Sequence, residues 1–548
     1  MLEDLEGEAW IGRILKDIQS SDFAEVSALI VNWESSVPKY SWLQNLKTGR
    51  IFGSTELFWR YCQLAERFSP VGNSPFRSVD FRPYLPEVPV IGVTPNRKNY
   101  VHRLAQADID AVRALNLDVI LRFGFNVIRG EILDTASFGV WSYHHGDNRS
   151  YRGGPAMFWE INNREPFCGT ILQRLSEELD NGQVLYRSYA QRQHTVWLNS
   201  VREKPYWKST AFVERNLRTL HQNRDNWPKS DESEGGSRGE VYKAPSNIQM
   251  LSFAARGIMR AIAGNLRAAT RQDQWFLAYR NNPGRFVSRT LETDSLDYQV
   301  IVPPRGSNFS DPFLFHSEGF DYCFFEETTS NDKKGRICCL RFDGNGKPSK
   351  PKTVLSADFH LSYPFIFTWK GEIFMMPEAG STNGVQVFKA SQFPHRWEHY
   401  AEVISGYPAY DPTLFEHGNK WYLFVNIDER GGGCDDELFL FVADTPLGPW
   451  QPHPKNPVKS DVRSARSAGG IFYHKGRIIR PAQDCSAVYG GAIQLNEITV
   501  LTETDFKEHV VGRIAATWRP GLNGCHTLNA SDRIEVIDAR HAVWRRPF

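Results

Sequence analysis

The sequence has no excess of charge of either sign and no long apolar run. Its 548 residues include 64 Lys and Arg and 63 Asp and Glu, which gives a formal net charge of +1. A chain so evenly charged is not expected to bind nucleic acid or an anionic membrane through its overall charge. No stretch approaches the roughly 18 apolar residues of a membrane-spanning helix. The acidic start, MLEDLEGEAW, lacks both the basic and the apolar region of a signal peptide.

Cysteine is sparse and is not spaced for metal binding. No pair has the C-x-x-C spacing of a zinc site, and the vicinal Cys338–Cys339 pair has poor geometry for a disulfide. Scattered thiols in a long chain without an export signal predict reduced cysteines in the cytoplasm. We therefore expect no metal site, and we expect the thiols to be buried as small hydrophobic groups. The eight are Cys62, Cys168, Cys323, Cys338, Cys339, Cys434, Cys485 and Cys525.

The first 200 residues alternate helix and strand patterns. Residues 8–19 place Trp10, Ile14 and Ile18 on one helical face, and residues 106–116 form a second amphipathic pattern. Short apolar strands are predicted at residues 27–31, 89–94 and 117–125. Strands that alternate with helices predict a parallel α/β sheet.

The composition changes between about residues 222 and 244, where Ser, Gly, Asp and Glu indicate a linker. A helix predicted at residues 246–270 could pack between domains through Ile248, Leu251, Ile258, Met259, Ile262 and Leu266. More than one domain is expected, because single cores stop growing at roughly 250–300 residues. The predicted organisation is an α/β domain at 1–214, a linker and connecting helix at 215–272, and an all-β domain at 273–548.

The last half repeats a strand, a turn containing Gly or Asp, and a second strand. The copies start at Asp311, Tyr363, Asp411 and Gly469, with a weaker fifth at His526. Their starts are 52, 48, 58 and 57 residues apart, near the blade period of roughly 40–50 residues. Five units of about four strands predict a five-bladed β-propeller, with the strand at 274–280 helping to close the ring. A β-sandwich would not explain the repetition.

A polar segment, SYHHGDNRSYRGG, follows an apolar strand at residues 142–154. Together with CGTILQ and LDNG, it resembles the core of folate-dependent formyltransferases, which include methionyl-tRNA formyltransferase and the sugar N-formyltransferases. In that family a Rossmann-like strand ends in Asn-x-His, a loop leads to Tyr-Arg-Gly, and Leu-Asp-x-Gly follows. The resemblance covers roughly residues 85–200. It places the family histidine on His144, the aspartate on Asp180 and the asparagine on Ser142.

The resemblance implies transfer of a formyl group from 10-formyltetrahydrofolate to an amine. Such a reaction needs an oxyanion stabiliser, a group that moves the amine proton, and a carboxylate that orients the histidine. His144 and Asp180 fit these roles, because a nearby carboxylate favours the protonated imidazole. His145 and Arg152 are candidates for substrate binding beside them. For Arg152 we favour hydrogen bonds that fix the loop through carbonyls, and for His145 the alternative is a solvated loop residue.

Two features depart from the family pattern. A serine hydroxyl at Ser142 offers one donor where an asparagine amide offers two. Either Ser142 substitutes, or His145 supplies the donor, or the chemistry has changed. The first helix begins near Glu8, which leaves no apolar segment for the central first strand of the sheet. Either the natural start lies upstream or another segment fills this gap.

The repeated half resembles the five-bladed domain of plant glucosamine inositolphosphorylceramide transferases and, more distantly, arabinanase- and xylosidase-type glycoside hydrolase propellers. HLSYPFIF, DPTLF and RPAQDC carry the resemblance. In those hydrolases carboxylates converge on the axis, and the matching positions here are Asp311, Glu378, Asp411 and Asp484. Blade four has Gln483 and Asp484 in place of a general-acid glutamate, so sugar binding is favoured over cleavage. The alternative for each Asp-Pro is a turn or strand start.

Three hypotheses follow. The first is a cytoplasmic N-formyltransferase that uses 10-formyltetrahydrofolate and an amine of a sugar or glycolipid precursor, while the propeller binds the glycan. The second is a glycan-active propeller enzyme whose formyltransferase-like half is altered or accessory, and the third is a binding protein without catalysis. The pair His144 and Asp180 favours the first, and Ser142 favours the other two. The expected partners are small molecules or glycans, without nucleic acid or a membrane span.

Overall fold

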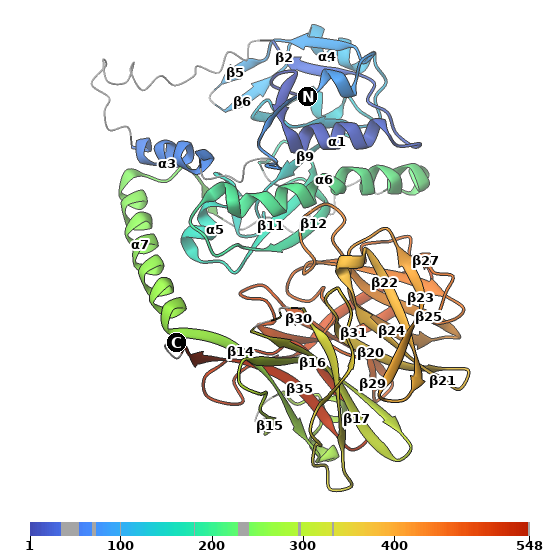
Figure 1. Ribbon diagram of the computed structural model, residues 1–548. Coiled ribbons are helices and arrows are strands. Elements are labelled where there is room, and N and C mark those ends of the chain that lie inside the picture. The colour runs from blue at the N-terminus through green and yellow to red at the C-terminus, as the bar shows by residue number, and fades with distance from the viewer. Residues whose placement is uncertain are drawn as a thin grey trace. The chain divides into compact units, whose positions relative to one another are not determined.

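The computed structural model in Figure 1 describes residues 1–33, 54–67, 73–98, 100–179, 181–227, 240–293, 297–330, 332 and 334–545. The chain divides into two compact units. The first contains Met1–Ser188, Arg192–Arg260 and Arg430–Gly432, and the second contains Tyr189–Gln191, Ala261–Glu429 and Gly433–Phe548. Among the described residues, no helix combines the length and apolar character needed to cross a membrane.

The first unit begins with the predicted amphipathic helix. In α1 (Ala9–Gln19) the residues Trp10, Ile14 and Ile18 are buried, as their spacing predicts. The predicted strands form β2 (Leu29–Asn32), β4 (Val90–Val93) and β7 (Ile120–Arg122), and residues 106–116 contain α4 (Gln106–Arg113). The longest helix among the described residues, α6 (Leu198–Gln222), continues past residue 214, where the sequence pattern places the end of the first domain.

Among the described residues of this unit, parallel strand pairs occur in four sheets, two of which hold β2 and β7. Strand β2 pairs in parallel with β4, and β7 pairs in parallel with β9 (Val140–His144). Strand β9 then pairs antiparallel with β11 (Phe167–Arg174), and β12 (Gln183–Gln191) completes the order β12-β11-β9-β7. The shorter elements are β1 (Glu6–Glu8), α3 (Glu56–Arg67), β3 (Ser78–Asp80), β5 (Asn96–Lys98), β6 (Val101–Arg103), β8 (Val127–Ile128), β10 (Tyr151–Gly153), α5 (Phe158–Asn163) and β13 (Glu240–Tyr242).

Met1 and Leu2 lie between these two sheets. The Met1 amine donates to the carbonyl oxygen of Leu121 at 2.6 Å, and the N–H of Phe123 donates to the carbonyl of Met1. On the other side, the backbone N–H of Leu2 donates to the carbonyl of Ile30, and the carbonyl of Leu2 accepts from the backbone N–H of Asn32. The two residues therefore occupy the place of a central strand. A complete Rossmann-like sheet stays a prediction.

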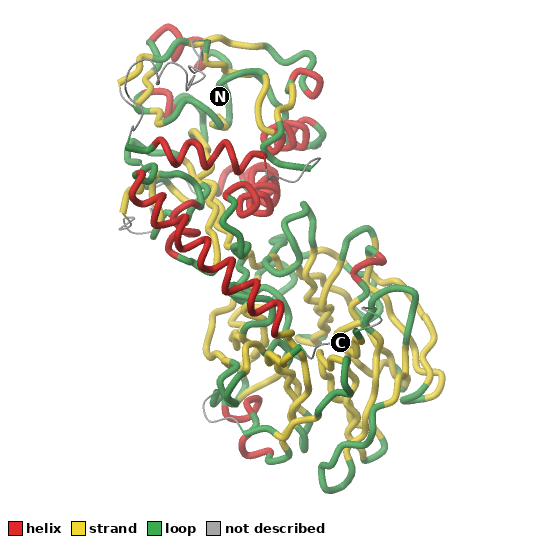
Figure 2. The backbone as a smooth tube through the Cα atoms, turned by 60° about the vertical axis from the view of Figure 1, so that its left-hand side comes forward, coloured by secondary structure: helices red, strands yellow, loops and turns green. Residues whose placement is uncertain are grey.

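The second unit consists mainly of five antiparallel sheets, which Figure 2 shows as strands joined by loops. Blade one is β16 (Ser307–Ser317), β17 (Phe320–Thr329), β18 (Arg336–Phe342) and β19 (Lys352–Leu355). Blade two is β20 (Ser362–Trp369), β21 (Glu372–Glu378), β22 (Gly384–Gln392) and β23 (Arg396–Ser405). Blade three is β24 (Ala409–His417), β25 (Lys420–Ile427), β26 (Glu437–Ala443) and β27 (Gln451–Pro452), with β28 (Lys459–Ser460) beside β26.

Blade four is β29 (Phe472–His474), β30 (Arg477–Asp484), β31 (Ala492–Leu501) and β32 (Phe506–Ala515). Blade five joins β14 (Arg271–Arg280) and β15 (Gln299–Ile301) to β33 (Leu522–Gly524), β34 (Leu528–Ala530) and β35 (Glu535–Trp544). A short helix, α8 (Val287–Thr290), follows β14, and α7 (Asn247–Thr270) precedes it. The five predicted repeats are confirmed, and each gives one sheet.

The five sheets close into a ring, because each shares a hydrophobic cluster with the next and the fifth shares one with the first. Representative pairs, in order around the ring, are Phe324 with Met375, Val387 with Leu423, Phe424 with Ile478, Ile493 with Ile537, and Val536 with Leu340. A closed ring of five sheets, each of four or five strands, is a five-bladed propeller. The ring is completed by β14, which pairs with β35 from Arg271↔Trp544 to Arg280↔Glu535.

Leu277→Ala tests this closure. Leu277 of β14 is fully buried in the cluster between blades five and one. We expect its truncation to lower the free energy of unfolding of the second unit by about 2–5 kcal/mol. Val510, on β32, is 51% exposed, so Val510→Ala should cost less than about 0.5 kcal/mol. Urea unfolding measures both, and similar values for the two variants would contradict closure through β14.

Candidate functional site

His144 lies at the carboxyl end of β9, beside its parallel neighbour β7. This edge is where ligands bind to α/β sheets. The Nε2 atom of His144 lies 2.7 Å from the carbonyl oxygen of Tyr151. Because a carbonyl only accepts hydrogen bonds, this ring nitrogen carries the hydrogen. Gly146 leaves room for the ring, since a Cβ there would lie 2.8 Å from Nε2.

Ser142 lies on the same face of β9 and binds an arginine that was not predicted from the sequence as a site residue. In the parallel pair, Arg122 of β7 is the partner of Ser142. Arg122 Nε donates to Ser142 Oγ at 3.0 Å, and Ser142 Oγ donates to the carbonyl of Arg122 at 3.3 Å. A guanidinium therefore reaches the position of the family asparagine. The feature of the sequence that could have pointed to Arg122 is its place as a charged residue in the otherwise apolar strand VILRFGF.

His145 is a core residue, so the alternative of a solvated loop residue is wrong. Its ring stacks on Tyr206 with centroids 3.6 Å apart, and it lies 5.3 Å from the ring of Trp10. Strand alternation directs it away from the face of Ser142 and His144, so it does not supply the missing donor there. Burial, followed by the charges of His144 and Arg202, holds the pKa of His145 well below its usual range.

Arg152 fixes the loop that carries the Leu-Asp-x-Gly sequence. Its Nη2 donates to the carbonyl oxygen of Leu179 at 2.6 Å, which agrees with the carbonyl-binding role predicted for it. Asp180, the next residue, lies outside the described residues. Its pairing with His144 stays a prediction.

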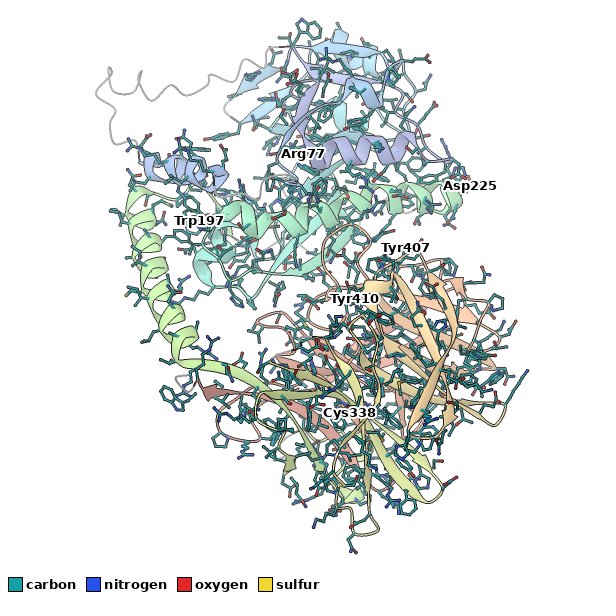
Figure 3. The ribbon with its side chains drawn as sticks, in the orientation of Figure 1. Arg77, Trp197, Asp225, Cys338, Tyr407 and Tyr410 are labelled. Carbon is teal, nitrogen blue, oxygen red and sulfur yellow. The ribbon has the colours of Figure 1, made fainter. Side chains whose placement is uncertain are left out.

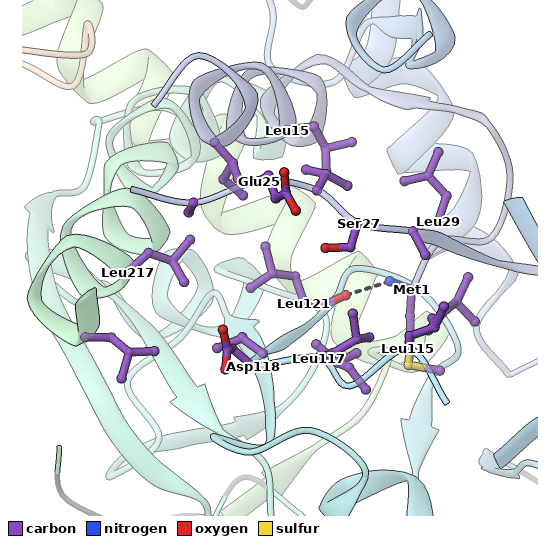
Figure 4. Close-up of a pocket in the computed structure, with 18 of the residues that line it drawn as sticks. Met1, Leu15, Glu25, Ser27, Leu29, Leu115, Leu117, Asp118, Leu121 and Leu217 are labelled. Carbon is purple, nitrogen blue, oxygen red and sulfur yellow. Dashed lines mark hydrogen bonds between the residues drawn. The ribbon is translucent and has the colours of Figure 1, made fainter. Parts of the chain in front are cut away.

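A cavity of about 500 Å³ lies at the opposite end of the strands (Figure 4). Residues that precede β2 and β7 line it, together with residues of α1 and α6, such as Leu15, Leu117 and Leu217. Figure 4 also shows the hydrogen bond from the Met1 amine to Leu121 at its border. Because ligands of α/β sheets bind at the carboxyl ends, His144 marks the candidate site and this cavity does not.

In the propeller, three blades begin with the same backbone irregularity. Asp311, Tyr363 and Asp411 have φ values of 52°, 46° and 49°, and a proline follows each. The strand register shifts at all three points. A bulge re-aims the side chain of the extra residue, and proline has no N–H to pair there. The repeated Asp-Pro is therefore a bulge signal, which is neither a simple turn nor a strand start.

Arg466 joins acidic residues of blades two and three. Its Nε lies 2.6 Å from Asp411 Oδ2, and its Nη2 lies 3.2 Å from Glu378 Oε2. Nη1 lies 2.8 Å from Asp435 Oδ1, and Figure 3 labels Tyr410, whose ring centre is 5.7 Å from the guanidinium carbon. Burial and the charge of Asp411 raise the pKa of Glu378 well above its usual range, although Arg466 opposes the shift.

Asp311 belongs to a second buried network, with His526 and Asp538. His526 Nδ1 lies 2.5 Å from Asp538 Oδ2 and 3.8 Å from Asp311 Oδ1. These side chains are of metal-binding types. However, Asp538 already accepts the backbone N–H groups of Asp311, His526 and Thr527. Burial opposes the charge of His526, but Asp538 and Asp311 raise its pKa to about 9. The network is therefore an imidazolium paired with carboxylates.

A ring of buried polar residues occupies equivalent positions in four blades. Each lies seven residues after the end of its hairpin turn, and they are Glu326, Glu378, Asn426 and Gln483. Gln483 Nε2 donates to Asp411 Oδ2 at 3.0 Å, so Gln483 is the blade-four residue that reaches the Arg466 cluster.

Asp484 is predicted to converge on the propeller axis with Asp311, Glu378 and Asp411, but its contacts are with other residues. Asp484 accepts hydrogen bonds from Ser486 and Arg513, because consecutive strand residues point to opposite faces. Of the four propeller residues predicted, Arg466 brings Glu378 and Asp411 together, and Asp311 lies in the adjoining network. Arg466, His526, Asp538 and Glu326 were not predicted from the sequence as functional residues. The hairpin spacing that Glu326 shares with Glu378 was the signal available for it.

Comparisons with known proteins match the two halves separately. The family described as glucosamine inositolphosphorylceramide transferase 1, N-terminal, matches residues 300–533. Glucosamine inositolphosphorylceramide transferase 1 of Oryza sativa subsp. japonica is 35% identical over 239 residues, which are 43% of this chain and 32% of that protein. The chain thus spans about a third of the length of these relatives. The resemblance of the repeated half to this family is confirmed.

The formyltransferase resemblance covers less of the chain. Methionyl-tRNA formyltransferase of Prochlorococcus marinus (strain MIT 9215) is 25% identical over 117 residues, which are 20% of this chain and 36% of that protein. Among solved structures, Zg3597, a family 117 glycoside hydrolase of Zobellia galactanivorans, is 14% identical with a TM-score of 0.32. Its match covers 49% of this chain and 90% of that chain.

The Glu326 carboxyl makes the stability of the second unit depend on pH. Burial, followed by the charge of Asp311, raises its pKa to about 8 from the usual 4.5. The folded state then binds a proton that the unfolded state releases, so this stabilisation is lost as the pH rises from about 4.5 through 8. Glu326→Gln should flatten the fall in the free energy of unfolding, measured with urea between pH 5 and pH 8. Glu318→Gln, on the exposed hairpin of the same blade, is the control. A Glu326→Gln slope equal to that of the unaltered protein would contradict the assignment.

Proposed function

We propose that this protein transfers a formyl group from 10-formyltetrahydrofolate to an amine of a sugar or glycolipid precursor, and that its propeller binds the glycan part. The observation that supports this most directly is the set Arg122, Ser142 and His144 at the carboxyl end of the β7–β9 pair. A cationic donor beside a histidine fits a carbonyl that becomes an oxyanion. Bound there, the folate would supply the formyl group.

Each of these three side chains has a different role in the proposed reaction. When the amine attacks the formyl carbon, negative charge develops on the formyl oxygen, and the Arg122 guanidinium can donate to it. Ser142 holds Arg122 in place through its hydroxyl. Because His144 binds the Tyr151 carbonyl through an N–H at Nε2, its ring is oriented. It is placed to take the proton of the amine and to give it to the folate nitrogen, which leaves when its bond to the formyl carbon breaks. Arg122 thereby replaces the amide donor that Ser142 cannot provide.

Variants of the first unit test this mechanism. His144→Ala should abolish formyl transfer, and Arg122→Met should lower kcat by about 10²–10³, the usual effect of losing an oxyanion donor. Ser142→Asn should preserve or raise the rate, and it should restore part of the activity of Arg122→Met. The assay is turnover of 10-formyltetrahydrofolate with a panel of amino sugars. Arg113→Met is the control, since Arg113 is 51% exposed on α4. Full activity of Arg122→Met, or no turnover with any amine, would refute the proposal.

A second candidate function is glycan binding by the propeller without formyl transfer. Its support is the Arg466 cluster, where carboxylates lie beside Tyr489, a ring 5.0 Å from the guanidinium and 37% exposed. Carboxylates beside an accessible aromatic ring suit sugar hydroxyls and the apolar face of a sugar. The name of the plant relatives suggests a glucosamine-bearing glycan as the first ligand to test.

Binding of glucosamine-containing oligosaccharides, measured by calorimetry, tests the propeller site. Tyr489→Ala should raise Kd about tenfold, because it removes the aromatic surface against which a sugar ring packs. Tyr473→Ala is the matched control, since Tyr473 is also exposed on blade four but hydrogen-bonds to His417. An equal change in both variants would place the sugar elsewhere.

A further inference from the structure

The cavity of Figure 4 lies at the amino end of the strand formed by Met1 and Leu2. All of its lining residues belong to the first unit. It lies between the chain that leads into β2 and the chain that leads into β7, and Met1 borders it. Met1 and Leu2 pair with both of these strands. Because neighbouring strands lie roughly 4.8 Å apart, β2 and β7 are separated there by the width of one strand.

The two flanking strands turn hydrogen-bonding edges toward this line. In β2, Leu29 pairs with β4, whereas the carbonyl of Ile30 accepts from the N–H of Leu2 on the opposite side. In β7, the carbonyl of Leu121 accepts from the Met1 amine. The N–H and the carbonyl of one strand residue point to the same side. The N–H groups of Ile30 and Leu121 are therefore directed toward the line of Met1, where both residues also line the cavity.

The strand of Met1 and Leu2 is buried on both of its faces. Met1 packs in one core cluster with Val112 of α4, and Leu2 packs in another with Ile18 of α1. A strand that is covered on both faces is apolar throughout. The wall of the cavity has the same character, because leucines from several elements line it. They are Leu15, Leu29, Leu115, Leu117, Leu121 and Leu217.

The Met1 amine is bonded as a backbone amide would be, since it donates to the carbonyl of Leu121 at 2.6 Å. Burial, followed by the charge of Arg122, lowers the pKa of this amine to about 5, because a buried ammonium loses its hydration. An amide N–H in this place makes the same hydrogen bond without that cost. Glu25 and Asp118, which also line the cavity, are exposed, so a chain joined at Met1 has a way out to solvent.

We propose that this cavity takes a short, extended, apolar peptide segment joined to the Met1 nitrogen, which lengthens the central strand and pairs with β2 and β7. The carbonyl of the residue joined to Met1 accepts the N–H of Ile30, and the carbonyl one residue earlier accepts the N–H of Leu121. A separate peptide fits less well, because its terminal carboxylate would be buried together with the Met1 amine. A bound aliphatic compound would leave both N–H groups without an acceptor.

Amide hydrogen exchange in two extended forms of the full chain tests this proposal. It needs neither folate nor an amine, so its result is separate from that of the formyl-transfer assay. One form carries Val-Ile-Val joined to Met1, and the matched control carries Ser-Gly-Ser. Exchange at Ile30 and Leu121 should be about tenfold slower in the Val-Ile-Val form, because these N–H groups enter a strand ladder. The amide of Leu423, in the second unit, should exchange equally in both forms.

Urea unfolding of the same proteins gives a second measurement. The Val-Ile-Val form should have a higher midpoint than the Ser-Gly-Ser form and the unextended chain, because its side chains bury apolar surface. Equal exchange at Ile30 and Leu121 in the two forms, or equal midpoints, would overturn the proposal. Slower exchange of the same two amides when free acetylated Val-Ile-Val peptide is added to the unextended chain would assign the cavity to a separate polypeptide, against the joined segment.

Discussion

The pairing of β14 with β35 is the constraint on which the second unit depends. It joins the first strand of the propeller to the last, over ten consecutive residue pairs. Without it, blade five would lose a strand and the clusters on both its sides would be open to water. At its end the buried Arg280 guanidinium lies 2.6 Å from Glu535, which also accepts a hydrogen bond from Tyr298. A buried ion pair adds little net stability, but breaking one partner is costly, so this pair favours one strand register.

The closed ring explains why so many charged groups can be buried at one end of the strands. Each bulge directs a side chain out of the regular pleat, and the ring brings these side chains together from different blades. Arg466 and the His526 imidazolium then offset carboxylates that would otherwise repel one another. In the first unit, strand pairing and strand alternation likewise determine which side chains meet. A parallel strand pair places Arg122 beside Ser142, and the alternation of β9 separates two adjacent histidines into a candidate site residue and a core residue.

Periodic features were predictable from the sequence, and long-range pairings were not. The spacing of Trp10, Ile14 and Ile18 predicted α1, and the repeat spacing predicted five blades, because both depend on local geometry. His144 could be placed because it follows a strand and precedes Tyr-Arg-Gly. Arg122 and Arg466 escaped prediction because their partners are distant in sequence. The sequence indicates where the second strand of blade four ends, but not which face each of its side chains points toward. The prediction therefore names Asp484, whereas Gln483 is the residue that reaches the Arg466 cluster.

The equivalent positions of Glu326, Glu378, Asn426 and Gln483 have a consequence for how such a site diversifies. One backbone unit, copied around an axis, delivers a polar side chain to an equivalent position in four blades, and the copies hold an acid in two of them and an amide in the other two. Since the backbone fixes where each side chain arrives, a change of chemistry in one blade leaves the geometry of its neighbours intact. A symmetric scaffold can thus present an asymmetric set of groups to an asymmetric ligand, one blade at a time.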